Sequence, residues 1–205
     1  MKTYPVIKRF REAKHLGFRG HTFAKLDGSN LRFEWERKRG WFRFGSRRRV
    51  INENHEIFGN SMDLFLRQFA ESFEKHAVNQ KWSGITVYCE FWGTNSFAGE
   101  HDLEDEKFLT PIDIAVYKRG MMDTDDFLKT FGNIFDLRYL GLLTWDREFV
   151  NQVENSSYPK MAFEGVVGKN GKGHKRVGIK LKSKVWIARV IEMYGEEKGQ
   201  KIVES

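Results

Sequence analysis

The sequence has very little cysteine and proline, and it has no long hydrophobic run. Of its 205 residues, one is cysteine (Cys89) and three are proline. One cysteine excludes an internal disulfide, and its apolar and aromatic neighbours are typical of a buried thiol in a reducing compartment. The six histidines lack the Cys/His spacing of a zinc site. No span approaches about 18 apolar residues and the N-terminus lacks the apolar run of a signal peptide, so we expect a soluble, cytoplasmic protein without membrane contact.

What the chain has in excess is positive charge. Its formal net charge is +7 and its pI is about 9.4. This balance favours a polyanionic partner such as nucleic acid, although many basic proteins have none. The length suffices for one domain with a good core, or for one domain with a small appendage.

Hydrophobic spacing predicts helices in three regions. Between residues 62 and 80 phenylalanine or alanine recurs every four residues, from Phe65 to Ala77, with Ser61 as a candidate N-cap. Residues 123 to 153 carry an apolar pattern interrupted by Gly132 and Gly141, which predicts further helices opening at Asp123. A closing helix is expected after residue 183. We interpret the first two regions as packing material.

A lysine and an aspartate stand beside a glycine in the stretch of residues 23 to 30, Phe-Ala-Lys-Leu-Asp-Gly-Ser-Asn. We interpret it as one strand turning at Gly28 into a second strand. Side chains two apart share a face of a strand, so Lys25 and Asp27 are expected to point the same way. Taken alone, the stretch is also compatible with an exposed hairpin and an ordinary ion pair.

Three later strand-like segments carry isolated charges among apolar residues. They are residues 88 to 93 with Glu90, residues 161 to 169 with Glu164 at their centre, and residues 177 to 182 with Lys180 and Lys182 on one face. Another strand is expected to begin after Pro111. Between residues 31 and 50, aromatic and basic residues interleave around a predicted turn at residues 38 to 40, so one hairpin face can be aromatic and the other positive.

In this order the four charged segments resemble the collinear motifs of the covalent nucleotidyltransferases, the superfamily of ATP-dependent DNA ligases, RNA ligases and messenger-RNA capping enzymes. The resemblance covers nearly the whole chain. It implies an α+β fold, an ATP-grasp-like nucleotidyltransferase domain with antiparallel sheets flanked by helices, and one such domain over residues 1–205. The 23 residues after Lys182 are too few for the OB domain that DNA ligases and capping enzymes place there.

The resemblance also implies roles for individual residues. Lys25 is the nucleophile, and Lys180 and Lys182 stabilise charge. An amine attacks phosphorus only when it is unprotonated, and a neighbouring ammonium group favours that form. Glu164 and Glu90 are implied at the metal, with Glu90 also at the ribose. The other implied nucleotide contacts are Ala24 through its backbone, Asp27, Asn30, Arg47 and Phe108.

Two of these assignments leave alternatives open. Phe108 matches the aromatic residue that stacks on the purine, but it can equally be a core phenylalanine. Arg47 follows Ser46 as in many ligases, with Arg48 as the neighbouring match. Arg43 and Arg48 are the candidate nucleic-acid contacts of the basic hairpin, and the alternative is that such charges merely solvate an edge.

Within the superfamily, Lys-x-Asp-Gly-Ser-Asn is most similar to the RNA ligase 2-like family of bacteriophages, in which the asparagine belongs to the metal–water site. Asp27 replaces the histidine of that family. The implied cofactors are ATP and Mg²⁺ or Mn²⁺, and the implied substrate is RNA, at a nick or break, with 5′-phosphate and 3′-hydroxyl ends. The alternatives are a minimal DNA ligase and a nucleic-acid-binding module without catalysis. A separate repair partner and a phage-encoded origin are compatible with the sequence.

Overall fold

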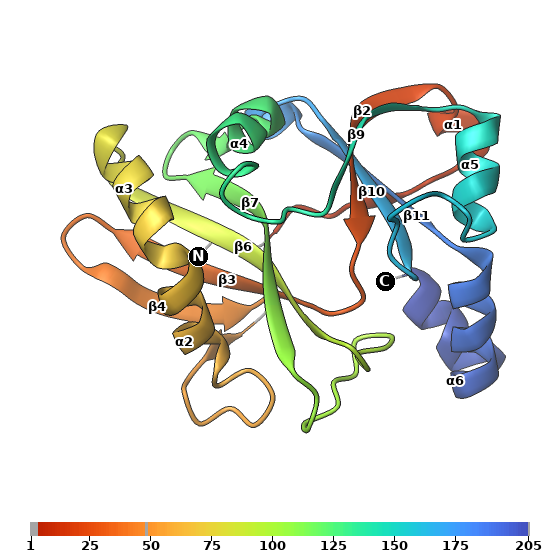
Figure 1. The fold of residues 1–205 in the computed structure, drawn as a ribbon, viewed down its shortest axis with the longest axis horizontal. Coiled ribbons are helices and arrows are strands. Elements are labelled where there is room, and N and C mark those ends of the chain that lie inside the picture. The colour runs from red at the N-terminus through yellow and green to blue at the C-terminus, as the bar shows by residue number, and fades with distance from the viewer. Residues whose placement is uncertain (1–3, 48, 205) are drawn as a thin grey trace. The chain divides into compact units, whose positions relative to one another are not determined.

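The computed structural model describes residues 4–47 and 49–204, with residue 174 described by its backbone alone. The chain forms two compact units, each built from segments far apart in the sequence (Figure 1). The first unit contains residues 4–5, Gly28–Leu137 and Lys172–Lys175, and the second contains Val6–Asp27, Arg138–Gly171 and residues 176–204.

The first unit is built on a six-stranded antiparallel sheet with the strand order β5-β4-β3-β6-β7-β8. Its strands are β3 (Ser29–Glu36), β4 (Gly40–Ser46), β5 (Val50–Ile51), β6 (Gly84–Gly93), β7 (Lys107–Val116) and β8 (Gly120–Met121). Its helices are α2 (Ser61–Phe65), the π-helical η1 (Leu66–Ala70), α3 (Glu71–Asn79), α4 (Thr124–Phe131) and the short 3₁₀ helix η2 (Gly173–Lys175).

Aromatic rings make the core of the first unit. Phe33 of β3 stacks on Phe65 of α2 with ring centroids 4.0 Å apart, and Phe73 of α3 contacts Phe131 of α4 at 4.5 Å. All four rings are buried. The four-residue phenylalanine spacing therefore marks the buried side of these helices, as the sequence predicted.

The second unit is built on a five-stranded sheet with the order β1-β11-β10-β2-β9. Its strands are β1 (Lys8–Arg9), β2 (Phe18–Lys25), β9 (Tyr139–Trp145), β10 (Gly165–Asn170) and β11 (Val177–Lys182), and only the β1–β11 pair is parallel within the described residues. Its helices are α1 (Glu12–His15), α5 (Arg147–Glu154) and α6 (Lys184–Glu204). Phe149, Val150 and Val153 of α5 pack with Val166, Ile179 and Leu181 of the sheet. Among the helices that the structure describes, none is both long and apolar enough to span a membrane.

The α+β class with antiparallel sheets and flanking helices is confirmed, but two local predictions were wrong. The strands on either side of Gly28 do not form a hairpin, because β2 pairs with β9 and β10 whereas β3 pairs with β4 and β6. The region from 123 to 153 is not all helical, because residues 139–145 form β9 between α4 and α5.

Smaller departures concern strand and helix ends. β7 runs through Pro111 instead of starting after it; where the chain is described, β8 pairs only with Ala115 and Val116, so that side of Pro111 needs no backbone donor. Asn60, not Ser61, is the residue before α2, and Ser61 Oγ donates to the Phe58 carbonyl. Glu164 precedes β10 rather than standing at its centre.

Candidate active site

Three strands of the second unit place two lysines on one face of the sheet. Lys25 on β2 and Lys182 on β11 both lie directly opposite Gly165 on β10. Directly opposed residues share a face, so the two lysines flank the glycine. Gly165 has φ +141, and a Cβ there would lie 2.0 Å from the Leu181 carbonyl oxygen. Only glycine fits this position, which brings the backbones of β10 and β11 together beside the lysines.

The carboxylate of Glu164 lies between the two ammonium groups. Lys25 Nζ is 2.7 Å from Glu164 Oε2, and Lys182 Nζ is 3.1 Å from Glu164 Oε1. Glu164 and Lys182 are almost fully buried, whereas 21% of the Lys25 side chain is exposed. Lys25 is therefore the more accessible of two amines that share one buried carboxylate.

Burial acts on the second lysine. Desolvation lowers the pKa of Lys182 from its ordinary value, and the charge of Lys25 lowers it further, while Glu164 opposes both effects. The Lys182 ammonium also lies 4.2 Å from the centroid of the Trp186 ring. Lys180 is buried on the same face, in the next row, where it lies opposite Val167.

Asp27 accepts a hydrogen bond from a residue that sequence spacing placed only on the closing helix. Asp27 lies in a bend after β2, so the regular alternation expected from Lys25 to Asp27 ends at Lys25. Trp186 Nε1, in the first turn of α6, donates to Asp27 Oδ2 at 2.5 Å. The helical spacing after residue 183 located Trp186, but nothing in its spacing pointed to Asp27.

Lys169 is a further cation that sequence reasoning missed. It lies on β10 opposite His21 of β2, on the face that carries Lys25, and it is buried. Its Nζ is 4.6 Å from the centroid of the Phe23 ring. The two-residue alternation from Val167 to Lys169 was the available signal.

Ala24 lies on β2 with its N–H donated to the Arg138 carbonyl, so that donor is already used.

In the first unit, three polar side chains form a row across β3, β6 and β7. Asn30 lies opposite Glu90, and Glu90 lies opposite Thr110. In the neighbouring row, Trp92 lies opposite Phe108 with ring centroids 4.9 Å apart, and Trp92 Nε1 donates to Thr110 Oγ1 at 3.1 Å. Asn30, Glu90 and Phe108, which the sequence assigned to nucleotide binding, thus gather on one sheet of the first unit.

The basic hairpin residues lie in the same unit. Arg43 Nη2 is 2.6 Å from Glu34 Oε2, and Arg32 Nε is 3.4 Å from Glu34 Oε1. Arg47 is exposed, and its carbonyl accepts from Arg32 Nη1. The prediction for Arg48 lies outside the described residues.

The two predicted metal ligands belong to different units, Glu164 to the second and Glu90 to the first. Among the residues that the structure describes, no group of three or more His, Cys, Asp or Glu side chains is arranged to hold a metal ion. Glu164 nevertheless offers a buried oxygen donor of the kind that hard cations take.

The fold is that of solved RNA ligases. The chain is similar to an archaeal ATP-dependent RNA ligase with a TM-score of 0.66 and 14% identity, over 94% of this chain and 51% of that one. It is similar to a mutant Naegleria gruberi RNA ligase with AMP and Mn at a TM-score of 0.64 and 12% identity, over 92% and 58%. The same ligase with PPi matches at 0.62 and 13%, over 92% and 58%. The chain therefore spans little more than half the length of these proteins. No family model and no curated protein matches the sequence.

Proposed function

We propose that this chain is the nucleotidyltransferase domain of an ATP-dependent RNA ligase that joins 5′-phosphate to 3′-hydroxyl ends. The observation that carries the proposal is the buried Glu164 carboxylate, 2.7 Å from Lys25 and 3.1 Å from Lys182. The neighbours' fold supports it, since those proteins are RNA ligases, and two of them are solved with AMP or ATP and Mn. The bacteriophage subtype, the single domain and the cytoplasmic location remain predictions.

In the first proposed step, the Lys25 amine attacks the α-phosphorus of ATP. A P–N bond forms, the bond to the β-phosphate oxygen breaks, and pyrophosphate leaves. The amine must lose a proton, and Glu164 Oε2 is at hydrogen-bonding distance to accept it. Lys182 and Lys180, on the same face, stabilise the charge that develops on phosphate.

In the later steps, the adenylyl group passes from Lys25 to the RNA 5′-phosphate, and the 3′-hydroxyl displaces AMP. A Mg²⁺ or Mn²⁺ ion would neutralise phosphate charge, and such ions commonly take one or two carboxylates together with substrate phosphates. Glu164 is the residue of the second unit that we assign to it, and the assignment of Glu90, in the first unit, to the metal and the ribose stays a prediction from the sequence. Asn30, opposite Glu90, and Phe108, in the neighbouring row, are proposed nucleotide contacts, and so are Asp27 and Arg47.

The proposal is tested by incubating the protein with α-labelled ATP and Mg²⁺ and running a denaturing gel. Label should stay on the wild type and disappear in Lys25→Ala. Lys14→Ala, which removes an exposed lysine of α1 in the same unit, is the matched control and should keep the label. An unlabelled wild type would leave only a nucleic-acid-binding protein on a ligase fold.

The substrate is tested with matched nicked duplexes that carry RNA or DNA on the 3′-hydroxyl side. Faster sealing of the RNA-containing nick is the expected result. Preference for the all-DNA nick would make the protein a minimal DNA ligase.

A further inference from the structure

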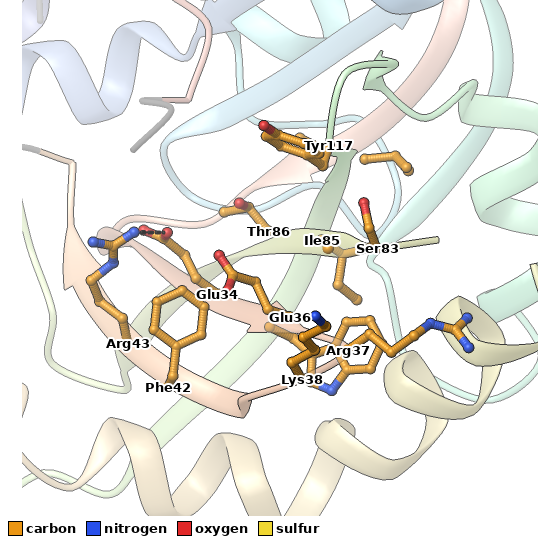
Figure 2. Close-up of a pocket in the computed structure, with 14 residues that line it drawn as sticks. Glu34, Glu36, Arg37, Lys38, Phe42, Arg43, Ser83, Ile85, Thr86 and Tyr117 are labelled. Atoms are coloured by element: carbon orange, nitrogen blue, oxygen red, sulfur yellow. Dashed lines mark hydrogen bonds and ion pairs between the residues drawn. The ribbon is translucent and has the colours of Figure 1, made fainter. Parts of the chain in front are cut away.

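The first unit contains a pocket that the proposed chemistry does not use. Its volume is about 600 Å³, within the range of roughly 300–1,000 Å³ found for sites that hold small organic groups. Its apolar lining includes Trp35, Ile85 and Val116, all of them buried. Figure 2 shows Tyr117 on one side and Phe42 and Arg43 on the other, with Glu34 and Thr86 between them.

The pocket lies on the face of the sheet that carries the proposed nucleotide contacts. Arg43, Glu34, Thr86 and Ala115 are directly opposed across β4, β3, β6 and β7, and all four line the pocket. Glu34 is four residues from Asn30 on β3, so it shares a face with Asn30 at about 14 Å along the strand. An extended ligand that contacts Asn30 can therefore continue along this face of the sheet into the pocket.

Aromatic surface is presented on both sides of the pocket. Tyr117 is 60% exposed, so its ring is accessible to a ligand. On the other side, the Arg39 guanidinium lies 3.8 Å and the Arg43 guanidinium 5.1 Å from the Phe42 ring centroid. Bases stack on such rings and on guanidinium planes.

Among the residues that the structure describes, the charged residues around the pocket that are not in ion pairs are positive. The two carboxylates in the lining are both engaged: Glu34 by Arg32 and Arg43, and Glu36 by Arg39 at 4.0 Å. Lys38 also lines the pocket, and Lys118 Nζ lies 5.5 Å from the Tyr117 ring centroid. Arg37 lines it too, but its guanidinium donates to the carbonyls of Val78 and Trp82. Stacking rings and a cationic rim complement a base that carries phosphates on both sides, and they do not complement a cationic or purely apolar ligand.

We propose that this pocket binds an unpaired base of an RNA strand, stacked on Tyr117, with the flanking phosphates beside Lys38 and Lys118. The proposal rests on the proposed function for the choice of RNA. It adds a binding site on the sheet of the first unit, for a nucleotide that is not itself joined.

The test is the fluorescence anisotropy of a labelled single-stranded RNA oligonucleotide titrated with the wild-type protein and with variants. Tyr117→Ala should raise Kd about 5- to 150-fold, because stacking is lost, whereas Tyr117→Phe should bind nearly as the wild type does. Lys38→Ala should reduce the salt dependence of log K by about 0.7, the value for one phosphate contact on a single strand. Lys75→Ala, an exposed lysine of α3 in the same unit, should leave that slope unchanged.

The outcomes separate this proposal from the ligase proposal. If RNA binding depends on Tyr117 but the protein takes no label from ATP, the ligase proposal is refuted and the proposal of a base-binding pocket stands. Unchanged Kd in Tyr117→Ala, with unchanged salt slope in Lys38→Ala, would overturn the pocket whatever the labelling shows. Equal, Tyr117-dependent binding of the matching DNA oligonucleotide would overturn the choice of RNA. Thermal melts of each variant, together with the binding of Tyr117→Phe, separate lost stacking from lost folding.

Discussion

At the scale of single residues, Glu164 tests the proposed proton transfer most directly. Glu164→Gln keeps the size of the side chain but removes the charge between Lys25 and Lys182. We expect the initial rate of lysine labelling to fall by about 100-fold or more, as when a general base is lost. The remaining rate should rise with pH more steeply than that of the wild type, because Lys25 must then give its proton to solvent. A rate within twofold of the wild type at neutral pH would contradict the assigned role.

His101 predicts a pH dependence of stability in the first unit. Its Nε2 lies 2.9 Å from Ser29 Oγ and its Nδ1 lies 3.1 Å from Ser96 Oγ. Burial, and then the charge of Lys107, lowers the pKa of His101 from 6.5 to about 4. Between pH 6.5 and pH 4 the His101 imidazole is protonated in the unfolded chain but neutral in the folded chain. The folded state is therefore stabilised fully above pH 6.5, and this stabilisation is lost as the pH falls towards 4.

The measurement is Tm at pH 7 and at pH 4.5 for the wild type and for His101→Gln. Because His101 is partly exposed, we expect an effect on the order of 1 kcal/mol after screening by solvent. The wild type should therefore lose about 2–4 °C more than the variant on acidification. Parallel losses in the two proteins would mean that His101 does not carry this pH dependence.

The residues of the second-unit site were predictable from motif order to different degrees. Lys25, Glu164 and Lys182 were all named from the sequence, and the structure brings their charged groups together. Trp186 and Lys169 were not, because a tryptophan at helical spacing and a lysine within a strand have the same local pattern whether or not they face the site. The contacts that distinguish them join strands and a helix far apart in the chain.

At the scale of elements, the first turn of α6 is predicted to fix the end of β2. Trp186→Phe keeps a ring under the Lys182 ammonium but removes the hydrogen bond from Nε1 to Asp27. A hydrogen bond to a charged group contributes about 1.5–3 kcal/mol. We expect the free energy of unfolding, measured by urea denaturation, to fall by about that amount.

A matched control for this change is Trp82→Phe, because Trp82 is buried in the first unit and its Nε1 makes no hydrogen bond among the described residues. The two substitutions remove similar volumes, so only the loss of the bond to Asp27 should differ. Equal losses of stability would show that the Trp186 hydrogen bond contributes nothing beyond packing.

The type of an element could be predicted where a hydrophobic spacing repeats over many residues. The prediction failed where pairing with a distant strand determines whether a segment is a helix or a strand. The phenylalanines of α2, η1 and α3 repeat over many residues, and the helix is there. Residues 139 to 145 offer only a short apolar run with Gly141 inside it, which is compatible with either a helix or a strand. They become β9 because β2 has an open edge for them, and an open edge on a distant strand leaves no local trace.

At the scale of the whole molecule, strand patterns alone could not divide the chain into two units. Lys25 and Asn30 are close in sequence, yet β2 and β3 join different sheets. The expectation of a hairpin followed from the turn residues at Gly28, which fit a hairpin and a connection between sheets equally well. Each unit is closed by strands from much later in the chain, so its composition depends on contacts that the order of motifs does not specify.

The net charge of +7 belongs to the whole molecule, and it requires a test that separates nucleotide recognition from general attraction to anions. Lys25→Ala should still bind ATP with Mg²⁺ but cannot be adenylylated, so thermal shifts of this variant report binding alone. At a ligand concentration of 100 Kd, stabilisation is about 2.7 kcal/mol, which corresponds to about 5–10 °C in Tm. Inorganic tripolyphosphate carries the phosphate charge without the nucleoside. It should give a much smaller shift if base and ribose are recognised, and an equal shift would mean that the positive charge of the protein accounts for the binding.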